Sequence, residues 1–254
     1  MKSAKILVFG KGGSGKSTVV TLLARRLCGE KAKVLVVDMD ESNATLYVML
    51  GLKPPSKTLT EFLGGRRNVA DALFKSKKNL DWSFTEKGIN KLPKEIVSWS
   101  DGLGLLVIGK ISEFKEGCAC PLNALAREFL KKINLPENEI IIVDTDAGIE
   151  HFGRGVEESA DILLMVVDPT LESIVIAEKA IKLSSRAGKP LFFILNKVDK
   201  NIEKLMLEHL PKDKVLAIIK YEPQITMLCL KGQPLNLNIP EIDKLVHSIK
   251  EMLS

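Results

Sequence analysis

The chain has 254 residues, 45% of them hydrophobic, which suits one large α/β domain with a sizeable core. No apolar run reaches the roughly 20 residues of a membrane-spanning helix, and the first residues lack the apolar stretch of a signal peptide, so we expect a cytoplasmic protein with reduced cysteines. The net charge of +5 is concentrated in residues 53–94, a pattern typical of a solvated face or a docking face for an acidic partner. Without interleaved aromatic residues the segment does not favour single-stranded nucleic acid.

Apolar runs rich in Val, Ile and Leu alternate with helical stretches along the chain, as expected for strands buried on both faces. The pattern predicts a single α/β domain over residues 1–254, with a mostly parallel sheet of about seven or eight strands and helices on both faces. The predicted strands are 5–9, 33–37, 103–108, 139–143, 162–167, 191–195 and 215–219. The predicted helices are 17–27, 121–133, 171–187, 202–209 and 241–253. Residues 51–102 are predicted to form an irregular basic insertion.

A glycine-rich stretch lies between the first predicted strand and the first predicted helix. In that context backbone N–H groups and a helix N-terminus converge on phosphate. The pattern G-x-x-x-x-G-K-[ST] predicts that Lys16 reaches the β- and γ-phosphates of a nucleotide and that the Ser17 hydroxyl holds Mg²⁺. The predicted nucleotide-binding residues of this loop are Gly12, Gly13, Ser14, Gly15, Lys16, Ser17 and Thr18.

Carboxylates follow two more predicted strands, Asp38 and Asp40 after one and Asp144 and Asp146 after the other. Because parallel strands end at the same edge of a sheet, we expect these side chains near the glycine loop. Asp38 and Asp144 are predicted to take part in Mg²⁺ binding, and Asp144 fits the Walker B acid. Asp146 and Gly148 form a predicted switch II, in which the Gly148 N–H senses the γ-phosphate.

A purine base is expected to contact the segment that follows the sixth predicted strand. Asn196 and Asp199 there can hydrogen-bond a base, and this motif alone leaves guanine open as an alternative to adenine.

Lys11 is a second lysine within the glycine loop. The run from Lys11 to Ser17 resembles the K-G-G-x-G-K-[ST] signature of the deviant Walker A ATPases, which include septum-site and plasmid partition ATPases and nitrogenase iron protein. This resemblance implies use of ATP and a homodimer in which Lys11 reaches the partner's phosphates, as an arginine finger does. It also implies that Lys11, Lys16 and Asp40 are catalytic, with Asp40 positioning the attacking water, and that Glu222 flanks the adenine.

Cys118 and Cys120 form a Cys-x-Cys pair before a predicted helix. In an extended chain both sulfurs point to one side, and Cys120 at the helix N-terminus gains thiolate character. Two thiolates do not complete a four-coordinate site, but two subunits supply four. The alternatives are unligated thiols or a strained disulfide. Cys28 and Cys229 are predicted to be core residues.

With the Cys pair and the segment from Asp144 to His151, the chain resembles the CooC-type nickel-insertion ATPases. This resemblance implies that Cys118 and Cys120 bind Ni²⁺, with Zn²⁺ fitting the same thiolates, and that the dimer delivers nickel to carbon monoxide dehydrogenase or a related metalloenzyme. His151 is either an additional ligand, a switch sensor or a structural imidazole.

Two other functions stay open. Four thiolates also fit an iron–sulfur cluster, as in a cluster carrier or an ATP-dependent reductase. A spatial organiser bound to membrane or DNA is the second, but the polar side of helix 241–253 mixes acids with lysines and does not favour anionic lipid.

Overall fold

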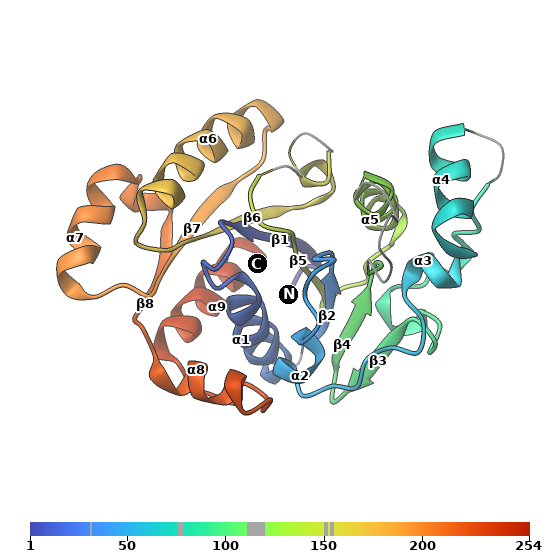
Figure 1. Ribbon diagram of the computed structural model, residues 1–254, viewed down its shortest axis with the longest axis horizontal. Coiled ribbons are helices and arrows are strands. Elements are labelled where there is room, and N and C mark those ends of the chain that lie inside the picture. Colours follow the sequence, from blue (N-terminus) through green and yellow to red (C-terminus); the bar gives the residue numbers. More distant parts are fainter. Residues whose placement is uncertain (31, 76–78, 111–119, 150–151, 153–154) are drawn as a thin grey trace.

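The computed structural model describes residues 1–30, 32–75, 79–110, 120–149, 152 and 155–254. One eight-stranded sheet forms its centre, in the order β3-β4-β2-β5-β1-β6-β7-β8 (Figure 1). All neighbouring strands are parallel except β3 and β4. The strands are β1 (Ala4–Gly10), β2 (Lys33–Asp38), β3 (Val97–Ser100), β4 (Leu103–Val107), β5 (Glu139–Asp144), β6 (Ile162–Val167), β7 (Leu191–Asn196) and β8 (Val215–Ile219).

Helices cover both faces of the sheet, which confirms the predicted fold class (Figure 1). The alternation within β1 shows this directly: Leu7 and Phe9 pack in one core with α5 and α6, and Ile6 and Val8 pack in the other with α1 and α9. The helices are α1 (Lys16–Gly29), α2 (Leu46–Met49), α3 (Leu59–Phe62), α4 (Gly65–Lys75), α5 (Cys120–Lys132), α6 (Leu171–Ala187), α7 (Lys200–His209), α8 (Pro223–Leu230) and α9 (Pro240–Met252).

The segment 51–102, predicted to be irregular, contains α3, α4, two short 3₁₀ turns and β3. Helix α3 begins with a capping box, in which the Glu61 carboxylate accepts from the Thr58 N–H at 2.7 Å and the Glu61 N–H donates to the Thr58 hydroxyl at 3.2 Å. The edge strand β3 lacks the continuous apolar run of the other strands because only its first residue, Val97, is buried. Its alternation of polar and apolar residues was the available signal.

Helix α9 packs on the core, with Ile242, Leu245, Val246 and Ile249 buried. This placement agrees with the prediction that the helix covers the core and uses the face that a membrane-surface helix would give to lipid. Among the described residues, no helix combines the length and the apolar character that crossing a bilayer requires.

Replacing Leu245 with alanine tests this packing, because the side chain is 0% exposed and its truncation leaves a cavity. We expect Leu245→Ala to lower the free energy of unfolding by about 2–5 kcal/mol. Urea unfolding followed by circular dichroism measures this loss, with the exposed neighbour Lys244→Ala as control. An unchanged midpoint in Leu245→Ala would contradict the packing.

Candidate functional site: a nucleotide-binding cleft

The glycine loop connects β1 to α1 and closes under tight steric limits. Gly10 has a φ of 149° and Gly15 a φ of 98°, a region that favours glycine. A Cβ atom on Gly10 would collide with the Val166 carbonyl oxygen, and one on Gly15 would collide with the Asn196 side chain. These two glycines are therefore required by the path of the loop.

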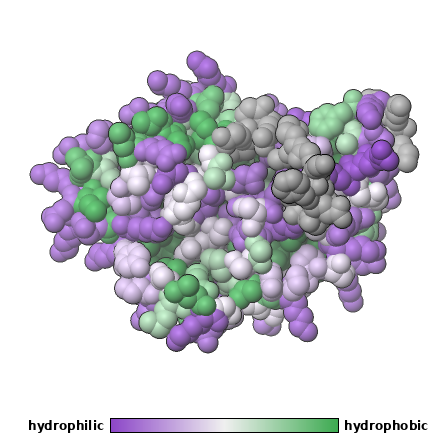
Figure 2. Space-filling view, viewed as in Figure 1, coloured by the Kyte–Doolittle hydropathy of each residue, from purple (hydrophilic) through white to green (hydrophobic). Residues whose placement is uncertain are grey.

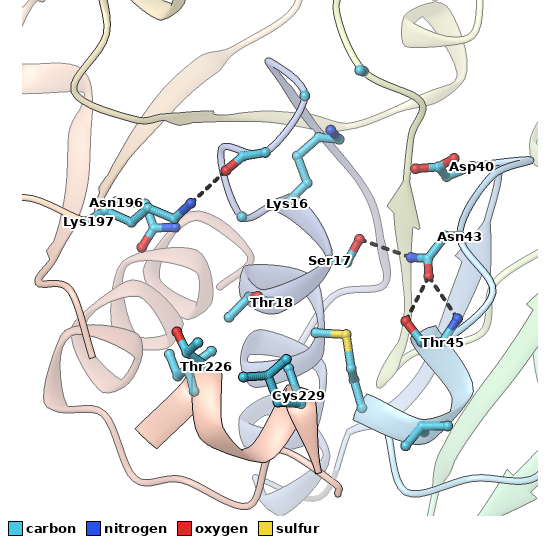
Figure 3. Close-up of a pocket in the computed structure, with 18 of the residues that line it drawn as sticks. Lys16, Ser17, Thr18, Asp40, Asn43, Thr45, Asn196, Lys197, Thr226 and Cys229 are labelled. Atoms are coloured by element: carbon cyan, nitrogen blue, oxygen red, sulfur yellow. Dashed lines mark hydrogen bonds between the residues drawn. The ribbon is translucent and has the colours of Figure 1, made fainter. Parts of the chain in front are cut away.

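Asn196, the last residue of β7, and Lys197, which follows it, brace the loop from the side. The Asn196 amide donates to the Ser14 carbonyl oxygen at 2.7 Å. The Lys197 ammonium donates to the Gly13 carbonyl oxygen at 2.7 Å (Figure 3). Asn196 also lines the cleft, so its contact with a base stays a prediction, but its amide N–H already has a partner. Lys197, which the sequence analysis did not single out, shares this bracing role.

Asp199 has a different place from the one that guanine recognition would need. It caps α7, where one carboxylate oxygen accepts from the N–H groups of Asn201 at 2.9 Å and Ile202 at 3.0 Å. It does not line the cleft. The observed geometry therefore gives the guanine alternative no support from this carboxylate.

The cleft is a cavity of about 1010 Å³ between the glycine loop, the segment 40–49 and helix α8 (Figure 3). The predicted site residues that line it are Gly12, Gly13, Gly15, Lys16, Ser17, Thr18, Asp40, Asp146, Asn196 and Glu222. Ser14 is buried and Lys11 is absent from the lining. Glu222 also caps α8, accepting from the Gln224 N–H at 3.2 Å. The sequence analysis missed Asn43, Thr45, Tyr221 and Thr226.

Asp144 and Asp38 end the neighbouring strands β5 and β2, where their positions are paired in register. Burial raises the pKa of Asp144 from 3.8 to about 7, and the nearby Ser17 hydroxyl opposes this shift. Burial also raises the pKa of Asp38 to about 6, against the charge of Lys110. No hydrogen bond of normal geometry reaches either Asp144 oxygen from the described residues. Buried, unsatisfied carboxylate oxygens beside a loop serine fit a divalent cation such as Mg²⁺.

The segment 38–45, called switch I below, turns beside this acidic pair. Asp40 accepts from the Ser42 N–H at 2.9 Å and from the Ser42 hydroxyl at 2.6 Å, so its carboxylate shapes the turn while lining the cleft. The Asn43 amide donates to the Ser17 hydroxyl at 3.1 Å (Figure 3). Switch I is thereby connected to the same serine that faces Asp144.

The two loop lysines point to different partners. The Lys16 ammonium turns back to the Lys11 carbonyl oxygen at 3.4 Å and is buried in the cleft wall. The Lys11 ammonium lies 3.4 Å from Asp168 and 3.9 Å from Glu172, at the end of β6 and the start of α6. Asp168 was missed by the sequence analysis, although it follows an apolar strand just as Asp38 and Asp144 do.

The predicted switch II is described only as far as residue 149. Gly148 has a φ of 98°, and its N–H donates to the Gly10 carbonyl oxygen at 2.9 Å. Contact of this N–H with a γ-phosphate requires that bond to open, and it stays a prediction. His151 lies outside the described residues.

Of the two residues in the Cys pair, the structure describes only the backbone of Cys120. Helix α5 begins at Cys120, in agreement with a helix following the pair, whereas Cys118 lies outside the described residues. Within the described part of the chain no three His, Cys, Asp or Glu side chains form a metal-binding group. Cys229 was expected in the core but is exposed and lines the cleft. Cys28 is half-buried and donates to the Asp101 carbonyl oxygen at 3.0 Å.

A parallel sheet that carries a glycine loop, a buried lysine and strand-end carboxylates at one edge defines a P-loop nucleotide-binding protein. The family model described as the CobQ/CobB/MinD/ParA nucleotide binding domain matches residues 5–235, and the chain belongs to this family.

Two curated relatives and one solved structure illustrate the kinship. An uncharacterised ATP-binding protein of Methanocaldococcus jannaschii is 45% identical, covering 95% of this chain and 98% of the relative. The carbon monoxide dehydrogenase accessory protein CooC of Rhodospirillum rubrum is 34% identical, covering 76% of this chain and 74% of that protein. The cell division ATPase MinD of Pyrococcus furiosus superimposes with a TM-score of 0.70 at 20% identity, covering 98% of this chain and 99% of that one. At that identity, the likeness to MinD shows the shared fold alone.

The buried acid Asp144 makes stability depend on pH. Its raised pKa means that ionisation costs the folded state more than the unfolded state, so stability falls as pH rises from about 4 to about 7. Asp144→Asn removes this cost, and we expect it to stabilise the metal-free protein at pH 8 by on the order of 2 kcal/mol, with a smaller gain at pH 5.

Thermal unfolding in EDTA at the two pH values measures the difference, and Asp213→Asn on the exposed surface is the control. A gain from Asp144→Asn that is equal at both pH values would contradict the assigned cause.

Proposed function

We propose that this chain is a cytoplasmic, ATP-hydrolysing metallochaperone. Two copies associate face to face around ATP, Cys118 and Cys120 of both copies hold one Ni²⁺ ion, and hydrolysis accompanies its delivery to carbon monoxide dehydrogenase or a related metalloenzyme. The observation that carries the proposal is the presence of both signatures in one chain, the Lys11–Ser17 loop and the Cys118–Cys120 pair. The CooC relative, named as an accessory protein of carbon monoxide dehydrogenase, supports it.

ATP hydrolysis is supported by the chemistry of the cleft. The loop offers backbone N–H groups and Lys16 to the phosphates, while Ser17 and Asp144, with Asp38 behind them, are the groups that would hold Mg²⁺. When bound there, Mg²⁺ neutralises charge on the β- and γ-phosphates. Asp40 lines the same cavity and is the residue that would orient the attacking water.

Dimerisation is supported by the position of Lys11. It does not line the cleft of its own subunit, and its side chain is 20% exposed beside Asp168 and Glu172. Leu171, next to Glu172, is 79% exposed, and Val175 one turn later is 40% exposed. Figure 2 shows hydrophobic surface over α6, where these residues lie. Apolar surface beside a partly exposed lysine suits a contact with a second copy.

The number of thiolates and their negative charge support metal binding by the Cys pair. Two thiolates leave a soft cation half-coordinated, and four from two subunits complete a tetrahedral site. Metal binding then depends on the dimer, and through Lys11 on ATP. An iron–sulfur cluster is the competing occupant of the same four sulfurs.

The lysine can be tested without touching the phosphate-binding groups. We expect Lys11→Ala to bind ATP but not to dimerise, and its turnover to fall by about 10³-fold, the scale of a residue supplied in trans. Light scattering with a non-hydrolysable ATP analogue and a phosphate-release assay measure both effects. The control is Lys244→Ala, an exposed lysine on α9, which packs in the other core from α6. Normal turnover by Lys11→Ala would contradict the proposal that Lys11 acts on the partner's phosphates.

The number of metal ions bound per chain tests the shared site. We expect one Ni²⁺ per two chains in the ATP-analogue dimer, and loss of tight Ni²⁺ binding in Cys118→Ser and Cys120→Ser with ATP binding retained. Anaerobic equilibrium dialysis with metal analysis measures this, and Cys28→Ser serves as the control cysteine. Unchanged stoichiometry in both variants would rule out the shared site, and a brown chromophore near roughly 400 nm after anaerobic purification would favour the cluster.

A further inference from the structure

We propose that Lys110 is a positioning residue for the ATPase reaction, and that its ammonium group holds switch I against the glycine loop. This inference rests on the proposed function for its kinetic consequence but not for the geometry. The sequence analysis gave Lys110 no role in the nucleotide site.

All three N–H bonds of the Lys110 ammonium group are engaged. It donates to the Asp38 carboxylate at 2.7 Å, to the Asp40 carbonyl oxygen at 2.6 Å and to the Asn43 carbonyl oxygen at 2.5 Å. An ammonium group has three donors and no acceptor, so this arrangement saturates it. The contacts join the start, the turn and the far side of switch I to one atom.

The chain before Lys110 is fixed, so a flexible side chain acts from a rigid base. The Ile108 N–H donates to the Asp38 carbonyl oxygen at 3.0 Å, and Thr60 donates to the Ile108 carbonyl oxygen through its N–H at 2.9 Å and its hydroxyl at 2.7 Å. A Cβ atom on Gly109 would lie 2.8 Å from the Thr60 hydroxyl and 2.9 Å from a Leu122 methyl carbon. Gly109 therefore permits a close approach that places Lys110 at the end of β2.

The contact network continues from Lys110 to the predicted Mg²⁺ ligand. Lys110 holds the backbone of Asn43, and the Asn43 side chain donates to the Ser17 hydroxyl at 3.1 Å and accepts from the Thr45 N–H at 3.1 Å (Figure 3). Fixing the backbone at Asp40 and Asn43 also fixes the two side chains that face the phosphate end of the cleft.

A simple counter-ion role for Lys110 would need only the Asp38 contact. Two of the three acceptors are backbone carbonyls, which carry no net charge to neutralise, so these contacts fix the position of the backbone. Their positions on either side of the turn make Lys110 a three-point clamp. Lys110 does not line the cleft, so removing it leaves the nucleotide contacts of Lys16 and the loop in place.

The clamp is tested first without nucleotide. In Lys110→Met, which keeps the aliphatic stem, we expect the backbone amides of residues 40–45 to exchange hydrogen at least about tenfold faster, while the amides of β1 and β5 keep their protection. Lys57→Met, at an exposed lysine paired with Glu95, should leave both regions unchanged. Unchanged exchange of residues 40–45 in Lys110→Met would overturn the clamp, and so would a loss of protection spread over the whole sheet.

The kinetic consequence is tested by separating turnover from affinity. We expect kcat of Lys110→Met to fall at least about tenfold, with the dissociation constant for ATP within about threefold of the wild-type value, since the lost contacts position Asp40 rather than hold the nucleotide. Lys110→Arg keeps the charge, but its planar donors cannot reproduce a three-point contact, so we expect only partial recovery of kcat.

Full recovery by Lys110→Arg, or equal losses of kcat and ATP affinity in Lys110→Met, would overturn positioning in favour of a charge or folding role. A wild-type protein that binds ATP without hydrolysing it would overturn the proposed function instead, and the hydrogen-exchange result would still decide whether Lys110 holds switch I.

Discussion

The nucleotide site depends on one electrostatic constraint: two buried carboxylates lie side by side at the carboxyl ends of two central parallel strands. Parallel register pairs Asp38 with Asp144, and the apolar strands that carry them admit little water. Such a pair is costly unless cations or hydrogen-bond donors lie close. Lys110 meets Asp38 from one side, while Lys16 favours ionisation of Asp144 from the other. The buried, unsatisfied oxygens of Asp144 leave room at this site for one more positive charge.

The chemical core of this site could be predicted because its parts are local in sequence. The glycine loop, Lys16 and the acids after β2 and β5 each follow an apolar strand, and parallel topology brings the strand ends together. What sequence could not give was pairing across long separations. Lys110 lies 72 residues from Asp38, and Asn196 lies 182 residues from Ser14, so neither contact leaves a local pattern. For this reason the sequence predicts a contact between Asn196 and a base but does not predict its hydrogen bond to the Ser14 carbonyl oxygen.

The fold shows the same division. The buried strands are continuous apolar runs, which the sequence predicts correctly. The edge strand β3 instead alternates polar and apolar residues, because one face of it is exposed to solvent. Helices α3 and α4 lie within residues 51–102, which the sequence analysis predicts to be irregular because a glycine pair such as Gly64–Gly65 is typical of a loop. Both have a positive φ, and Gly64 lies in the turn after α3 while Gly65 begins α4. Cys229 lies in an apolar helix, but no residue of α8 is fully buried, and the Cys229 side chain is exposed and lines the cleft.

One end of the sheet limits how copies of this chain can meet. At this end β3 has only four residues and two are serines, which is a poor template for another strand. This margin therefore does not favour backbone pairing between molecules, which guards that side of the sheet against growth into fibres. Association through side chains on helices and loops can be made and broken without disturbing the backbone hydrogen bonds of the sheet.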